Sequence, residues 1–323
     1  MAANDEFDEV LAPSEIAGPD IADPALMENV DNSAGQKVPF LEMLLMNIQR
    51  SGDMIGGDKF TGELICLAMI FVWILCYLYG RMANEKIAVN WINTYKSYFD
   101  ENFAFMSSAS TAKPDPNALL HRETLADYSF FASGRVNCAG MYLEINLLKR
   151  HDVVMRVIDA LAFPFHDKVT IQIPLNPNVD SIFLLAVCRK GKQEAFRSQR
   201  KEFQEFSPQV STSLFSSAMI VMCEAPDAIQ QLFDSQAMKC LGDLEDMIEL
   251  ICVSDLNAEP VEGFNVIPAK LLTFTFRLLD PSNPEKMRPL VELAVRLVDT
   301  IHQMKLSGSS KGKVEKNRKI LAE

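Results

Sequence analysis

The stretch "ELICLAMIFVWILCYLYGRMANEK", residues 63–86, decides how the rest of the chain is organised. From Leu64 to Gly80, seventeen consecutive residues carry no charge. At a rise of ~1.5 Å per residue the run is roughly 25 Å long, close to the ~27 Å hydrocarbon thickness of a thin bilayer. No helical face of it is polar, whereas a buried helix of a soluble domain usually keeps one polar edge. We therefore predict a transmembrane helix over residues 63–81, with a fully buried core helix as the alternative.

Small side chains within this run indicate a second role for it. Ala68 and Cys76 are eight residues apart and so share one helical face. Small residues let two membrane helices approach closely. We predict Ala68 and Cys76 as the face that a partner helix contacts. The alternative is an anchor that faces lipid and has no fixed partner.

The negative charge of the chain is concentrated before the apolar run. The net charge is −12, and residues 1–63 hold thirteen acidic residues against three basic ones, a net of −10. The segment is also rich in Ala, Pro and Asn, so we predict a largely disordered segment over residues 1–62. Its densest acidic group is a candidate for weak calcium binding, although it lacks the spacing of a calcium loop. The residues of this group are Asp5, Glu6, Asp8 and Glu9.

The positions of the cysteines predict on which side of the membrane the part of the chain after the apolar run lies. All seven cysteines are in or after the apolar run, with no CxxC and no zinc spacing. The chain also has no Asn-x-Ser/Thr sequence. Both observations favour reduced thiols in the cytosol, and Arg81, Lys86 and Lys96 after the run agree with that orientation. The N-terminal segment then lies on the other side of the membrane, which is the lumenal side if the membrane is that of the endoplasmic reticulum.

Residues 82–306 alternate irregularly between strand and helix patterns. Met141, Leu143 and Ile145 alternate with polar residues, as in a half-buried strand, and Asp152 is a predicted helix N-cap. We predict an α+β domain with a mixed sheet of about five or more strands and flanking helices. The predicted strands are 127–134, 140–150, 168–175, 182–190, 245–255 and 270–280. The predicted helices are 81–106, which continues the apolar run, 152–163, 191–206 and 283–306. Residues 217–233 are either a strand followed by a helix or one helix.

Motifs of catalysis are missing from the sequence. There is no GxGxxG, HExxH or GxSxG, and "GDMIGGDK" has Asp58 where a phosphate loop needs Lys. The four histidines are scattered over different predicted elements. We therefore expect no enzyme activity and no cofactor beyond weak calcium. A membrane-tethered enzyme with a dispersed site stays open as an alternative.

The end of the chain, residues 307–323, is predicted to be a basic tail. From Met304 to Glu323 there are six Lys or Arg and two Glu, a net of +4. Such a tail suits a polyanion, either RNA phosphate or lipid headgroups, and the alternative is a solvated tail without a partner. The candidate residues for this contact are Lys311, Lys313, Lys316, Arg318 and Lys319.

Two stretches carry a resemblance to a known family. They are "GRMANEKIAVNWINTYKSYFDENFAFM", residues 80–106, and "SGRVNCAGMYLEINLLKRHDVV", residues 133–154. They resemble the coiled-coil domain-containing protein 47 family, also called calumin, and the likeness covers roughly residues 63–319. The matching residues are Ala88, Trp91, Asn93, Ser133, Gly134, Arg135, Val136, Cys138, Gly140, Met141, Leu148, Lys149, Arg150 and Asp152.

The resemblance implies a non-enzymatic subunit of the PAT complex, an intramembrane chaperone of the endoplasmic reticulum. The implied partners are the small membrane protein Asterix, the Sec translocon, the ribosome and nascent multipass membrane proteins. With the ribosome as a partner, the five basic tail residues become the candidate ribosome-binding residues. The family also has a cleaved signal peptide, a dense acidic lumenal run credited with weak calcium binding, and a long charged C-terminal helix. This sequence shows no signal and a thinner acidic segment, and it stops near the start of that helix. A lumenal calcium-binding membrane protein is the alternative function.

Overall fold

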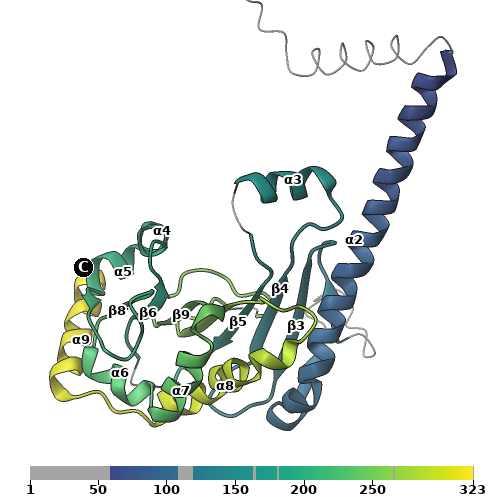
Figure 1. Ribbon diagram of the computed structural model, residues 1–323. Coiled ribbons are helices and arrows are strands. Elements are labelled where there is room, and N and C mark those ends of the chain that lie inside the picture. Colours follow the sequence, from purple (N-terminus) through teal and green to yellow (C-terminus); the bar gives the residue numbers. More distant parts are fainter. Residues whose placement is uncertain (1–58, 108–118, 163–164, 180–181, 265, 323) are drawn as a thin grey trace, which may run out of the picture. The chain divides into compact units, whose positions relative to one another are not determined.

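The computed structural model describes residues 59–107, 119–162, 165–179, 182–264 and 266–322. The calcium candidates Asp5, Glu6, Asp8 and Glu9 lie outside the described residues, as does nearly all of the predicted disordered segment. The chain divides into two compact units, Met1–Leu67 and Ala68–Glu323. The second unit holds the sheet and the remaining helices (Figure 1).

The first described element is the helix α2 (Lys59–Asn102), which is 44 residues long. Within the described part of the chain, it alone is long and apolar enough to cross a membrane. Its first half exposes large apolar side chains such as Ile70 and Trp73. Its second half buries the stripe of Ala88, Trp91, Tyr95 and Phe99, spaced by three or four residues. The uniform half and the striped half thus have the patterns of a spanning helix and of a domain helix.

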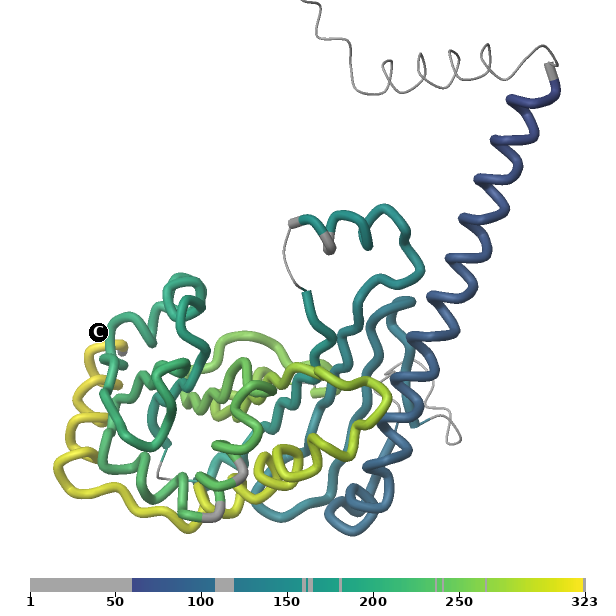
Figure 2. Tube along the Cα trace, viewed as in Figure 1, coloured from purple at the N-terminus to yellow at the C-terminus, as the bar shows by residue number. Residues whose placement is uncertain are grey.

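Ten of the described strands form one sheet, and every described strand pair is antiparallel. Figure 1 draws strands of this sheet as arrows, and Figure 2 traces the path of the chain from the same side. The order is β1-β3-β4-β5-β10-β9-β6-β8-β7, with β2 paired to β3. The strands are β1 (Phe105–Ser107), β2 (His121–Arg122), β3 (Asp127–Ser133), β4 (Met141–Asn146), β5 (Lys168–Pro174), β6 (Leu185–Arg189), β7 (Gln209–Val210), β8 (Met219–Cys223), β9 (Ile248–Ser254) and β10 (Leu271–Arg277).

The prediction of a mixed sheet is therefore wrong, although the α+β class and the six predicted strands are confirmed. A parallel pair needs a connection that crosses from one end of the sheet to the other. Here the connection from β4 to β5, which contains α3 (Val153–Ala162), starts and ends at the same end of the sheet, so these neighbouring strands are antiparallel. The alternating pattern of a strand predicts the strand itself, but not whether the neighbouring strand runs parallel or antiparallel to it.

The remaining helices are α4 (Gln193–Gln199), α5 (Lys201–Phe206), α6 (Pro226–Leu232), α7 (Ser235–Asp243), α8 (Arg288–Gln303) and α9 (Gly308–Ala322), with short 3-10 turns at Glu245–Met247 and Pro284–Met287. The ambiguous segment 217–233 is strand β8 followed by α6. The predicted helix 191–206 is broken at Arg200, whose ψ of 86° is not helical.

Three hydrophobic clusters of the described residues pack against the sheet, and the two largest separate its faces. The larger one joins the striped half of α2, α6, α8 and residues such as Leu185 and Val187 of β6. The alternate β6 residues Ala186 and Cys188 belong to a smaller cluster, which includes Phe203 of α5. The period of two along β6 therefore sends its side chains into two different clusters, one on each face of the sheet.

Candidate functional site at the junction of α2 and the sheet

The uncharged half of α2 ends where the helix touches the loop that follows β4. A Cβ built on Gly80 would lie 2.2 Å from the carbonyl oxygen of Arg150 and 2.4 Å from the amide nitrogen of His151. Real Cβ atoms do not approach backbone so closely, so only glycine fits here. One turn earlier, the Tyr77 ring meets the His151 ring edge to face, with centroids 6.1 Å apart.

Asn84, one turn after Gly80, fixes the helix to two loops of the domain. Its side chain is fully buried. Nδ2 donates to the carbonyl oxygens of Leu125 and Leu148, each at 3.0 Å, and Oδ1 accepts from Arg150 Nη1 at 3.1 Å. A buried amide is costly unless it is hydrogen-bonded, and here both its nitrogen and its oxygen have partners.

Arg150 extends this network to a buried ion pair. Its Nη2 lies 2.6 Å from Asp167 Oδ2 and its Nη1 lies 2.9 Å from Asp167 Oδ1. The Asp167 carboxylate is 3% exposed and also accepts from the Leu148 amide at 2.8 Å. The bidentate geometry adds directional specificity to the charge attraction. We call Gly80, Asn84, Arg150 and Asp167 the junction; it fixes the direction in which α2 leaves the sheet.

Sequence reasoning found Arg150 but missed Asn84 and Asp167. The signal for Asn84 was present, because it continues the buried stripe of Ala88 and Trp91 at helical spacing. A polar residue on a buried stripe requires partners from elsewhere in the fold. No local pattern distinguishes Asp167, since its partner lies 17 residues away along the chain.

The SGRV motif that carries the resemblance ties three elements together. Arg135 donates from Nη1 to Asn102 Oδ1 at 2.7 Å and from Nη2 to Asp299 Oδ2 at 2.6 Å. Asn137 donates to Asp299 Oδ1 at 3.2 Å and has a φ of 71°. Asn tolerates this left-handed backbone better than most residues. The motif therefore connects the end of α2, the β3–β4 loop and α8.

The predicted partner face lies on the exposed half of α2. Ala68 is exposed and Cys76 is half-buried. Neither residue belongs to a hydrophobic cluster of the described domain. The structure therefore leaves Ala68 open and covers Cys76 in part, and the role of this face as a partner contact stays a prediction.

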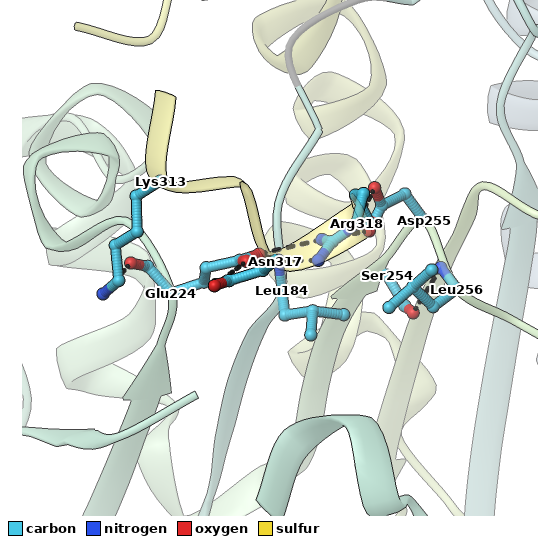
Figure 3. A network of polar contacts seen from close by, with 8 residues as sticks. All are labelled: Leu184, Glu224, Ser254, Asp255, Leu256, Lys313, Asn317 and Arg318. Atoms are coloured by element: carbon cyan, nitrogen blue, oxygen red, sulfur yellow. Dashed lines mark hydrogen bonds and ion pairs between the residues drawn. The ribbon is translucent and has the colours of Figure 1, made fainter. Parts of the chain in front are cut away.

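The basic tail forms helix α9, and it contacts the domain through part of its charge (Figure 3). Arg318 lies 2.8 Å from Oε2 of the fully buried Glu224 and 2.7 Å from Asp255 Oδ1. Asn317 Nδ2 donates to Glu224 Oε1 at 2.7 Å, and Lys313 Nζ donates to the Glu224 carbonyl at 2.9 Å. Burial lowers the pKa of Arg318, but Asp255 and Glu224 outweigh it and raise the pKa above its ordinary value.

The five predicted ribosome-binding residues thus fall into two groups. Lys313 and Arg318 are engaged with Glu224. Lys311, Lys316 and Lys319 are exposed on α9. Sequence reasoning could not separate them, because the partners of Arg318 lie 63 and 94 residues away in the chain. The exposed three remain the candidates for an external polyanion.

The described cysteines of the sheet domain are poor nucleophiles. Burial raises the pKa of Cys138 and Cys188 to about 11 and that of Cys223 and Cys252 to about 12, so these thiols stay protonated at neutral pH. Among the described residues, no group of three or more His, Cys, Asp or Glu could hold a metal ion.

An open groove of about 480 Å³ lies beside the loop that precedes β10. Its lining is apolar except for Lys270, whose Nζ donates to the carbonyl oxygens of Pro177 and Val179 at 2.5 and 2.7 Å. A catalytic pocket needs several converging polar groups, and this groove offers one lysine that is already hydrogen-bonded.

Comparison with known proteins gives one family. Residues 59–323 match the model of the family described as PAT complex subunit CCDC47. The chain is 26% identical over 281 residues to the proteins of that name from Danio rerio and Homo sapiens, covering 81% of this chain and 57% of each relative. An uncharacterized protein of Arabidopsis thaliana is 24% identical over 311 residues, covering 93% of this chain and 63% of that protein. The chain therefore spans little more than half the length of the curated relatives it matches.

Proposed function

Because the chain belongs to the PAT complex subunit CCDC47 family, we propose that it is a non-enzymatic subunit of an intramembrane chaperone in the endoplasmic reticulum. In this role it assists the insertion of multipass membrane proteins beside the ribosome-bound Sec translocon. Its proposed partners are an Asterix-like small membrane protein, the translocon, the ribosome and the nascent chain.

The junction is the observation that carries this proposal. A free anchor would need only a flexible linker between span and domain, whereas here α2 is continuous and Asn84 and Gly80 fix it to the sheet. Fixing a helix in this way orients a membrane surface and a soluble surface relative to each other. A scaffold that holds a partner in the bilayer and a ribosome beside it needs that property.

The proposal is tested in membranes depleted of the endogenous subunit. Adding back the wild-type chain should restore insertion of a multipass reporter and leave a single-pass reporter unchanged. An Asterix-like protein and translocon subunits should co-purify in mild detergent. Failure to restore insertion of the multipass reporter, with correct membrane integration of the chain, would contradict a chaperone role.

The proposed orientation places the N-terminus in the lumen and the sheet domain in the cytosol. It is supported by the free, buried cysteines described in the domain and by Arg81 and Lys86 directly after the uncharged run. In sealed microsomes, added protease should digest the domain and spare the N-terminal segment. Protection of the domain would reverse the orientation.

The proposed ribosome contact is made by Lys311, Lys316 and Lys319. Three phosphate contacts give a slope of about −2.1 to −2.7 in log affinity against log salt, which is a loss of about 20- to 40-fold between 50 and 200 mM. Deleting α9 is a poor test because it would uncover the buried Glu224.

The sharper variant replaces those three lysines by glutamine, with Lys96, Lys201 and Lys239 as the matched control, since these are also exposed. Ribosomes are titrated with the full chain in nanodiscs of neutral lipid over a salt series. Only the first variant should weaken binding and flatten the salt slope. Equal losses in both variants would remove α9 from the contact.

A further inference from the structure

Helix α3 turns an apolar stripe outward. Val154, Val157, Ile158 and Leu161 follow the i, i+3, i+4, i+7 spacing of one helical face. These side chains are 64, 53, 46 and 82% exposed. Phe165, just after the helix, is 54% exposed. Amphipathic helices of soluble domains place such a stripe against the core, so this face lacks the cover that its sequence requires.

The domain supplies no cover for this stripe. None of the described side chains of α3 belongs to a hydrophobic cluster. The N-terminus of the helix is nonetheless capped, because Asp152 Oδ1 accepts hydrogen bonds from the amides of Val154 and Met155 at 3.0 and 3.1 Å. Figure 1 shows α3 standing away from the sheet on the connection between β4 and β5. The exposure is therefore a property of the fold rather than of a frayed segment.

The junction fixes the level at which α3 begins. Gly80 is the last residue of the uncharged run, and its backbone is in direct contact with Arg150 and His151. Only Asp152 separates His151 from the first residue of α3. The start of α3 is therefore held at the height where α2 passes from its uncharged half to its charged half, which is where a bilayer crossed by α2 would end.

Charge at this level also matches a bilayer surface. Lys149 precedes α3 and is exposed, and Arg156 is exposed on the face of α3 opposite the stripe. Lys86 is exposed on α2, six residues after the uncharged run ends at Gly80. Basic side chains around an apolar face are typical of helices that lie in the plane of a membrane interface.

We propose that α3 lies in the headgroup–acyl boundary of the bilayer that α2 crosses, with Val154, Val157, Ile158 and Leu161 turned toward the acyl chains. At ~1.5 Å per residue the helix is about 15 Å long, so it fits flat on one leaflet. The membrane rather than a protein is the occupant, because the junction already holds α3 at the bilayer edge whatever else binds. The proposal rests on α2 crossing a membrane and is independent of the chaperone role.

The test measures the depth of single probes on the full chain in vesicles that contain no other protein. Cys66, Cys76 and Cys240 are replaced by alanine, and the remaining cysteines are buried. An environment-sensitive nitrobenzoxadiazole label is attached at Leu161→Cys on the stripe or at Arg156→Cys on the opposite face. The vesicles contain phosphatidylcholine and phosphatidylserine, with lipids that carry a nitroxide either near the headgroup or at the acyl-chain end.

The label at residue 161 should emit at shorter wavelength than the label at 156 and be quenched about threefold more, since an interfacial helix buries its apolar face about 5–10 Å deep. The shallow nitroxide should quench it more than the deep one. Water-like emission and equal quenching at both positions would overturn the proposal. Short-wavelength emission without lipid quenching would also overturn it, because the stripe would then be covered by protein.

Discussion

α2 is one continuous helix, yet its two halves place their apolar side chains in opposite environments. The only two tryptophans of the chain show the contrast: Trp73 in the first half is 53% exposed, whereas Trp91 in the second half is fully buried. The halves meet at Gly80. The first has apolar residues at every angle, and the second has them on one stripe. The arrangement of apolar residues, and not their amount, decides what each half contacts.

The junction explains how the two halves coexist in one helix. A spanning helix needs no fixed neighbour in the domain, but Asn84 and Arg150 make the next turns part of the sheet structure. If this interpretation is correct, substitutions before and after Gly80 should differ in their effect on the stability of the domain. Changes in the second half should lower domain stability, and changes in the first half should not.

The largest effect is expected for Trp91→Ala. Removing a fully buried tryptophan leaves a cavity in the core, which lowers the free energy of unfolding by about 3–5 kcal/mol. The matched control is Trp73→Ala, which should leave domain stability unchanged. Urea unfolding in mild detergent, followed by circular dichroism at strand wavelengths, measures both. Similar losses in the two variants would mean that the halves are not energetically distinct.

A smaller effect is expected when the junction loses its cation. Arg150→Met leaves the Asp167 carboxylate buried without its ion-pair partner, and because Arg150 is itself 21% exposed we expect a loss of about 2–3 kcal/mol. The control, Arg122→Met, breaks a 4.0 Å pair between half-exposed side chains and should cost less than about 1 kcal/mol. The double variant Arg150→Met, Asp167→Asn should recover part of the loss, and no recovery would contradict the charge argument.

Gly80→Ala tests the closest contact of the junction. The added Cβ forces the loop away from α2, which costs about 1–3 kcal/mol and is partly offset by the ~1 kcal/mol better helix propensity of alanine. Gly62→Ala is the control, because nothing lies within 4 Å of its added Cβ. Hydrogen exchange at the amides of residues 147–152 should accelerate only in the first variant. Unchanged hydrogen exchange at these amides would show that the loop can move to accommodate the added Cβ without losing stability.

Much of this fold could be predicted from local pattern. A helix over the uncharged run, the strand β4 and the N-cap Asp152 are all predicted by residues close together in the chain, and the structure confirms these three elements. Strand direction was not predictable in this way, because the sense of β5 beside β4 depends on how the connection returns. The family resemblance was also carried by short motifs, and the matching family confirms it.

The missed features are long-range pairings and a face turned the unexpected way. Arg318 was treated as one more charge of a basic tail, but Glu224, 94 residues earlier, holds it. Helix α3 was predicted correctly as a helix, yet its amphipathic pattern normally predicts a buried stripe and here the stripe is exposed. Periodicity gives the existence of an apolar face; what covers that face depends on where the rest of the chain places it.

The smallest effect on domain stability is expected when most of the first half of α2 is replaced by leucine. Replacing residues 64–75 by leucine keeps Cys76, Tyr77 and Gly80, which are half-buried or lie at the junction, and therefore leaves the contacts of the domain intact. Urea unfolding should be unchanged within error, because the side chains exchanged are exposed. The replacement removes Ala68, so a partner helix that packs closely on the Ala68 and Cys76 face should no longer fit. Co-purification of the Asterix-like protein measures this loss, and the single change Ala68→Leu is the sharper test because membrane insertion should be the same. Full retention of the partner by both variants would place the contact outside this half of α2, and a loss of domain stability would contradict the division at Gly80.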